Sequence, residues 1–408
     1  MAASRHAGSC PSTSSDAAAA RYLPAAKSRS LALDAPKMTV VSMETSAAYR
    51  DLRVRPDSDL WQGVNRLVDR APSLAAIRAH RLDLIAHARW RELGQLVPQV
   101  LVDEALAQTK RGLATPLLLA RIRAACDGPI VLLKGPETAA CYPRPALRRY
   151  ADLDLLVPDA REVQRALIAA GFVAVGEESV YTGIHHLRPL HLAGFPLTVE
   201  IHMQPKWVDG LAPPRVDELL GSAIKSVVPV DGILALPRST HALTLAAHDW
   251  AHIPLGRVLG LVDVAMVREG VPADELRSLA ADWGLQRVWR LTSAAIDAVF
   301  LGGRRPWPLR MWARNLREAR ERTVLATHLQ RWLAGFSALP PGAALAATAR
   351  AVAKDFQPVP GETWSTKLLR TRLALANATS PRSQHDAKVE DALAQRGIER
   401  QDLDDEVH

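Results

Sequence analysis

Two pairs of polar residues recur inside otherwise apolar, strand-like runs. Asp152 and Asp154 lie two residues apart, as do Glu200 and His202. Because strand side chains alternate, each pair is expected on one face of its strand, with apolar neighbours turned to a core. Crowded carboxylates are costly without a cation, and Mg²⁺ takes carboxylate oxygens together with substrate phosphates. The pattern therefore predicts Asp152, Asp154 and Glu200 as catalytic metal ligands for two Mg²⁺ ions about 4 Å apart; solvated strand charges are the alternative.

A lysine and a glycine follow the first strand-like run of the same region. Lys134 and Gly135 end the apolar stretch 129–133, and a short helix is expected before Tyr142. Glycine lets the backbone approach a phosphate closely, and lysine supplies a point charge. We expect both residues to bind the triphosphate of a nucleotide, although a simple turn would also explain them.

The pattern of apolar residues changes along the chain and predicts how these residues are positioned. Helical spacing precedes and follows a segment of short strands, so the expected class is α+β, a small mixed sheet flanked by N- and C-terminal helical units. The expected parts are a disordered extension at 1–46, a helical unit at 47–125, the α/β core at 126–235, a helical domain at 236–376 and a polar tail at 377–408.

Composition limits the partners. The net charge is +8 over 408 residues, but arginine far outnumbers lysine and no basic run with interleaved aromatic residues occurs. A nucleic-acid partner is therefore possible but not favoured. No apolar run approaches the roughly 18 residues that span a bilayer, so we expect a cytoplasmic protein with no membrane contact. Three cysteines without a CxxC pair argue against structural zinc.

His248 and His252 form a further pair, four residues apart on an expected helix. Two histidines at this spacing can bind zinc. No third ligand is evident nearby in the sequence, and packed or capping histidines are the commoner explanation. The role of the pair stays open at this point.

Several of these motifs, taken in order, resemble a known family. The chain is similar to the bacterial uncharacterised nucleotidyltransferase family, within the polymerase-β-like nucleotidyltransferase superfamily, over roughly residues 60–340. The matching elements are Lys134-Gly135, Arg148-x3-Asp152-x-Asp154 and Glu200-x-His202. The resemblance implies that Asp152 and Asp154 bind the metals, that Glu200 completes the carboxylates, and that Gly135 lies beside the triphosphate. It leaves two roles for Arg148, a phosphate contact or a brace for the aspartates, and it places His202 among the nucleotide-site residues.

The implied activity is transfer of a nucleoside monophosphate from an NTP to an acceptor, with release of pyrophosphate. The acceptor is unidentified, and a peptide or a small molecule is expected by family analogy. One alternative is a catalytically decayed nucleotide-binding or toxin–antitoxin-type interaction protein, because Pro136 follows Gly135 and lacks a backbone N–H. Another is an enzyme that adds nucleotides to RNA.

Overall fold

The computed structural model describes residues 53–359 and 362–394. The expected extension at 1–46 and the end of the expected tail, 395–408, lie outside the described residues. All described residues belong to one compact unit. Its division at 47–125, 126–235, 236–376 and 377–408 stays a prediction.

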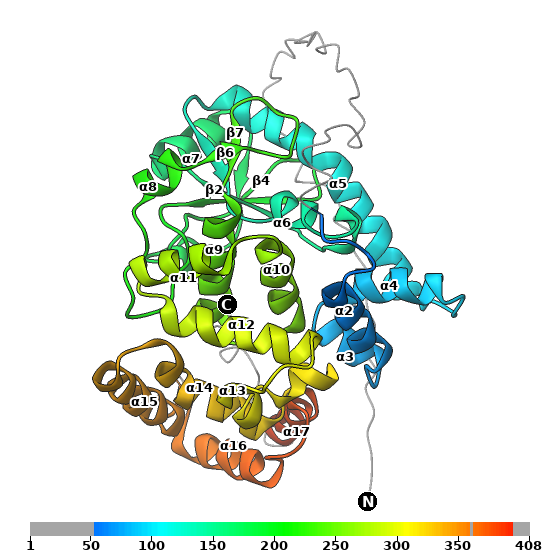
Figure 1. Cartoon of the computed structure of the whole chain (residues 1–408). Helices are drawn as coiled ribbons and strands as arrows, with labels where there is room; N and C mark the ends of the chain where they lie inside the picture. The colour runs from blue at the N-terminus through cyan, green and yellow to red at the C-terminus, as the bar shows by residue number, and fades with distance from the viewer. Residues whose placement is uncertain (1–52, 360–361, 395–408) are drawn as a thin grey trace, which may run out of the picture. The chain divides into compact units, whose positions relative to one another are not determined.

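Within the described part of the chain, the strands form one seven-stranded mixed sheet (Figure 1). Their order across the sheet is β3-β4-β5-β2-β1-β7-β6. The β2–β5 and β1–β7 pairs are parallel, and the other neighbours are antiparallel. The strands are β1 Ile130–Leu132, β2 Asp152–Leu156, β3 Val173–Ala174, β4 Leu190–His191, β5 Thr198–His202, β6 Ile224–Lys225 and β7 Ile233–Ala235. This mixed sheet, flanked by helices, confirms the α+β class.

Helices precede, interrupt and follow the sheet. Before it lie α2 Asp59–Asp69, α3 Leu74–Ala79, α4 Asp83–Glu92 and α5 Gln99–Ala125. Between the strands lie α6 Pro136–Ala140, α7 Ala160–Ala169 and α8 Val216–Gly221, with 3-10 turns at Pro145–Leu147 and Glu178–Tyr181. After it lie α9 Arg238–His252, α10 Val258–Arg268, α11 Ala273–Asp282, α12 Gln286–Phe300, α13 Trp307–Met311, α14 Val324–Ala338, α15 Pro341–Phe356, α16 Trp364–Ala376 and α17 Arg382–Ala394, with a 3-10 turn at Arg314–Glu318. No described helix is both long and apolar enough to cross a membrane.

The alternation of side chains along β2 and β5 decides which face of the sheet carries the polar residues. Leu153 and Leu155 of β2, with Val199 and Ile201 of β5, are fully buried in a core that includes the apolar side of α5. Because strand side chains alternate, Asp154 and Glu200 emerge on the opposite face. The hydrophobic effect thus fixes the register that places the polar residues together.

Local signals set the turns around these strands. Asp159 caps α7 by accepting a hydrogen bond from the Glu162 amide at 2.9 Å. Gly171, at φ 96°, follows the end of α7. An aspartate N-cap and a left-handed glycine are the usual signals for the start and the end of a helix, and they bound α7 between β2 and β3.

Helix α9 lies beside the polar face of the sheet. Near its start, His241 contacts Thr138 of α6, with Nε2 and Oγ1 3.2 Å apart. At its end, His252 contacts Lys206, which follows β5. His248 lies between them on the same helix face, because residues seven and four apart share a face. The helices after the sheet therefore contribute side chains to this region.

Candidate active site

Three donor groups converge on the polar face of β2 and β5. Asp154 is the register partner of Glu200, and His202 ends β5 two residues further on. His202 Nε2 lies 3.0 Å from Asp154 Oδ1 and 3.7 Å from Glu200 Oε2. One donor atom from each of the three residues lies within 4.8 Å of the others. The parallel pairing of two strands thus builds the cluster.

A lysine neutralises the most deeply buried carboxylate of this cluster. Lys134 Nζ lies 3.1 Å from Asp154 Oδ1, and the Asp154 side chain is 0% exposed against 17% for that of Lys134. Burial by itself would raise the pKa of Asp154, but Lys134 and His202 outweigh it and hold this pKa well below its usual range. The charge crowding expected from the sequence is therefore offset within the protein by two cationic side chains.

The other charges of the cluster shift in consistent directions. Burial lowers the pKa of His202, but its bonds to Asp154 and Glu200 raise it overall, which favours the protonated ring. Glu200 is 23% exposed, and although burial raises its pKa, the bond with His202 lowers it overall. One group of interacting charges is therefore formed by Asp154, Glu200, His202 and Lys134. Solvent reaches this group at Glu200 and Lys134.

Asp152 lies one strand period before Asp154 on the same face of β2. Burial raises its pKa, and the charge of Asp154 raises it further. It is not one of the three donors that lie within 4.8 Å of one another. The structure therefore brings Asp154 and Glu200 together, adds His202, and leaves Asp152 as a partly exposed carboxylate beside them.

The two carboxylates of this cluster are the donors that suit a divalent cation. A donor oxygen of Asp154 and one of Glu200 lie within 4.8 Å of each other, near enough to share one ion, and His202 bonds to both carboxylates. Asp154 Oδ2 and His202 Nδ1 are buried and have no hydrogen-bond partner among the described residues. Buried polar atoms without partners are uncommon in native structures. The donor set is therefore chemically open to a further ligand.

Lys134 and Gly135 form the turn between β1 and α6. Gly135 has φ 74°, a left-handed conformation that favours glycine. Pro136 is the first residue of α6, where the missing N–H removes no helical hydrogen bond and the fixed φ suits the helix. Pro136 therefore suits the start of α6, and it offers no backbone N–H to a ligand. With only five residues, α6 adds little dipole to an anion site.

Arg148 lies in a separate, closed network. Its Nε and Nη2 each donate to Asp263 of α10 at 2.8 Å, and its Nη1 donates to the Gly135 carbonyl at 3.3 Å. Tyr142 also donates to Asp263, at 2.5 Å. This guanidinium holds the Gly135 turn against α10 through Asp263, and the two roles left open by the sequence, a phosphate contact or a brace for the aspartates, stay predictions.

Histidines and a second lysine border the cluster. His186 Nε2 lies 3.9 Å from Glu200 Oε2, and the rings of His185 and His202 are 5.3 Å apart. Lys206 Nζ lies 2.8 Å from His252 Nδ1.

The His248 and His252 rings are 4.6 Å apart, but neither joins a group of three metal donors among the described residues. Zinc binding by that pair therefore gains no support.

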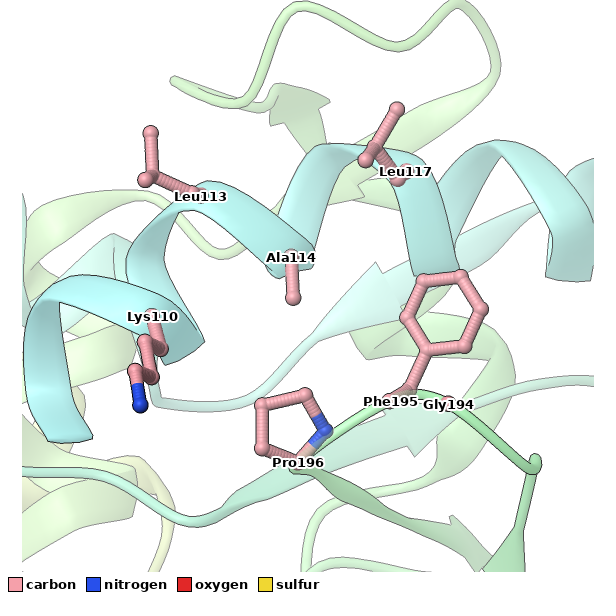
Figure 2. A pocket seen from close by; sticks show the side chains of 7 residues that line it. All are labelled: Lys110, Leu113, Ala114, Leu117, Gly194, Phe195 and Pro196. Carbon is pink, nitrogen blue, oxygen red and sulfur yellow. The ribbon is translucent and has the colours of Figure 1, made fainter.

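A separate depression of about 610 Å³ lies between α5 and the turn that precedes β5 (Figure 2). Its lining is mostly apolar and consists of Lys110, Leu113, Ala114, Leu117, Gly194, Phe195 and Pro196. Helix α5 packs on the face of the sheet that carries Leu153 and Leu155. This depression is therefore not on the carboxylate face and is not part of the candidate active site.

A mixed sheet that presents two carboxylates and a histidine beside a lysine-glycine turn is an arrangement suited to phosphoryl transfer. The family described as "Uncharacterised nucleotidyltransferase" matches residues 68–300, more than half of the chain. The chain belongs to this family, which confirms the resemblance to the uncharacterised nucleotidyltransferase family; that the family is bacterial stays a prediction. No curated protein and no solved structure matches the chain.

Sequence reasoning missed two parts of this arrangement. Lys206 had no signal, because a single lysine after a strand is indistinguishable from a solvated one. The pairing of Arg148 with Asp263 joins residues 115 positions apart, and no local spacing reveals it. His252 had a signal in its spacing to His248, but that spacing suggested zinc rather than a contact with lysine.

Proposed function

We propose that this protein is a Mg²⁺-dependent nucleotidyltransferase that moves a nucleoside monophosphate from an NTP to an acceptor, a peptide or a small molecule. The observation that carries the proposal is the convergence of Asp154, Glu200 and His202 within 4.8 Å, beside Lys134. Membership of a nucleotidyltransferase family supports the reaction class. The Mg²⁺ requirement, the NTP and the acceptor are parts of the proposal.

The side chains have separate tasks in this proposal. Asp154 and Glu200 hold the cation, with Asp152 available for a second ion, and His202 fixes the orientation of Asp154. Bound Mg²⁺ would lower the pKa of the acceptor hydroxyl and offset the charge of the leaving pyrophosphate. With an ion on Asp154, Lys134 would be free to contact a phosphate oxygen.

The turn at Gly135 has a positioning task. Its left-handed φ favours glycine, and an added Cβ there would lie 3.6 Å from the Asp152 carbonyl, so the turn packs its backbone closely against β2. Arg148 holds the Gly135 carbonyl from behind, so the turn keeps its geometry when the anion binds. Preorganised contacts of this kind reduce the ordering cost of binding.

The test is transfer of label from each NTP in the presence of Mg²⁺ and a cell extract, with the labelled species identified by mass spectrometry. Asp154→Asn should reduce transfer at least about 100-fold, because loss of a cation ligand removes several kcal/mol of transition-state stabilisation. The matched control is Asp282→Asn, an exposed aspartate at the end of α11. Absence of any label transfer by the wild-type protein, or equal transfer by both variants, would contradict the proposal.

A further inference from the structure

Lys206 is a half-buried cation without a carboxylate partner. It follows β5, and its Nζ lies 2.8 Å from Nδ1 and 3.0 Å from Nε2 of His252, so it donates to whichever ring nitrogen carries no proton. Among the described residues no aspartate or glutamate forms an ion pair with it, whereas the other lysine of the site, Lys134, is paired with Asp154. The two lysines of the site therefore differ in whether their charge is neutralised.

An unpaired ammonium in this position is energetically unfavourable. Burial and the charge of Lys134 together lower the pKa of Lys206 to about 8, against the weaker opposing effects of Glu200 and Asp209. A partly desolvated cation is stabilised when an anion supplies the missing partner. An ammonium has no acceptor atom, so His252 accepts in this contact and cannot serve as the counter-ion.

The surroundings of Lys206 are suited to an anion that reaches in from solvent. His252 is exposed at the end of α9, and His248 lies one turn earlier on the same face. Burial and the ring of His202 together lower the pKa of His185 to about 3, so His185 is a neutral imidazole that can donate one N–H. The region beside the carboxylate cluster thus offers one cation and neutral donors, with no competing carboxylate bonded to them among the described residues.

We infer that Lys206 and His252 form a subsite for a polyphosphate anion, the β- and γ-phosphates of the NTP. This inference rests on the proposed function, because it assigns the transferred α-phosphate to the carboxylate cluster and the leaving pyrophosphate to the α9 side. Lys134 remains at the β1 turn, so the two lysines contact the triphosphate from two different elements. The helices after the sheet then contribute directly to nucleotide binding.

The experiment is isothermal titration of the full chain with inorganic pyrophosphate, with non-hydrolysable analogues of the four NTPs, and with the four nucleoside monophosphates, all in Mg²⁺. Lys206→Met should weaken pyrophosphate and the bound NTP analogue about tenfold or more and leave monophosphate affinity unchanged. Lys206→Arg should retain most of the affinity, because it keeps the positive charge. Lys225→Met is the matched control, since Lys225 is an exposed lysine on the far edge strand β6, and it should behave like the wild type.

The outcomes separate this subsite from the proposed function. Pyrophosphate binding that depends on Lys206, in a protein that transfers no nucleotide, would support the anion site and contradict the nucleotidyltransferase proposal. Nucleotide transfer with pyrophosphate and analogue affinities unaltered in a folded Lys206→Met variant would overturn the subsite and leave the proposed function standing. Weakening of monophosphate to the same extent would also overturn it, because the lysine would then face the α-phosphate.

Discussion

Two buried ion networks lie next to each other in this protein and differ in how completely their atoms are bonded. In the first, Asp263 receives two hydrogen bonds from Arg148 and one from Tyr142. In the second, Asp154 Oδ1 is shared between Lys134 and His202. Asp154 Oδ2 has no hydrogen-bond partner in the described part of the chain. Both aspartates are buried and paired with a cation, yet only one retains an unused acceptor.

The difference separates a structural network from a functional one. A bidentate arginine saturates a carboxylate and fixes its geometry, whereas a lysine supplies a point charge that can move. The Arg148 network joins the Gly135 turn to α10 and is closed to ligands. The Asp154 network is neutralised without being saturated, as the proposed exchange of the lysine for a metal cation requires. Burial and charge alone would not have distinguished the two aspartates.

Breaking the closed network should produce the largest loss of stability. Arg148→Met leaves Asp263 buried without a counter-ion, which should lower the free energy of unfolding by about 3–5 kcal/mol in urea denaturation. The double variant Arg148→Met/Asp263→Leu should recover much of the loss, because it removes both charges. A loss below about 1 kcal/mol in the single variant would show that the Arg148 network contributes little to the stability of the fold.

Glu137 extends the comparison to a buried carboxylate that pairs with no cation among the described residues. It accepts hydrogen bonds from Ser226 and from the Val227 amide, yet burial outweighs them and raises its pKa from 4.5 to about 7. A raised carboxyl pKa means that the folded protein holds the proton more tightly than the unfolded chain. Stability from this group is therefore present below pH 4.5 and is lost as the pH rises through 7, by about 3 kcal/mol in total.

The measurement is the free energy of unfolding of wild type and Glu137→Gln at pH 5 and pH 8. Glutamine keeps the shape and an acceptor oxygen but does not ionise, so the variant should lack this part of the pH dependence. The difference between the two proteins should change by about 3 kcal/mol between the two pH values. Parallel pH profiles would show that the pKa of Glu137 is not raised in the folded protein.

The two networks also show what the sequence could and could not reveal. The alternation in β2 and β5 and the order of the motifs predicted the α+β class, the family and the shared face of Asp154 and Glu200. These depend on local spacing and on burial of every second strand residue. The partners of Arg148 and Lys206 lie on helices far along the chain, and their contacts depend on tertiary packing. His202 was assigned to nucleotide binding, but only the strand register shows that its ring bonds Asp154.

Opening the second network should have a smaller effect on stability than breaking the first. Asp154→Asn removes the counter-ion of Lys134, whose side chain retains 17% exposure to solvent. The free energy of unfolding should fall by about 1–3 kcal/mol, less than for Arg148→Met, because water can partly solvate the ammonium. Since Lys134 and His202 lower the pKa of Asp154, its contribution is present at neutral pH and is lost as the pH falls. A stability equal to or above wild type would mean that repulsion from Asp152 and Glu200 dominates instead.

The smallest effect concerns Lys134 and tests whether its ammonium and a divalent cation compete for Asp154. Because Lys134 Nζ and His202 Nε2 both lie about 3 Å from Asp154 Oδ1, a cation that binds this oxygen must displace the ammonium. Lys134→Met should therefore strengthen Mn²⁺ binding in the absence of nucleotide by about 1 kcal/mol, roughly fivefold. The same variant should weaken binding of a non-hydrolysable NTP analogue, since the displaced lysine is then no longer available to a phosphate.

Mn²⁺ titration followed by electron paramagnetic resonance measures the first effect without any need for turnover, with Lys225→Met as the control. If Lys134→Met instead binds Mn²⁺ more weakly, Lys134 supports the metal site and does not compete for it. The Asp154 network would then be closed to cation exchange, like the Arg148 network.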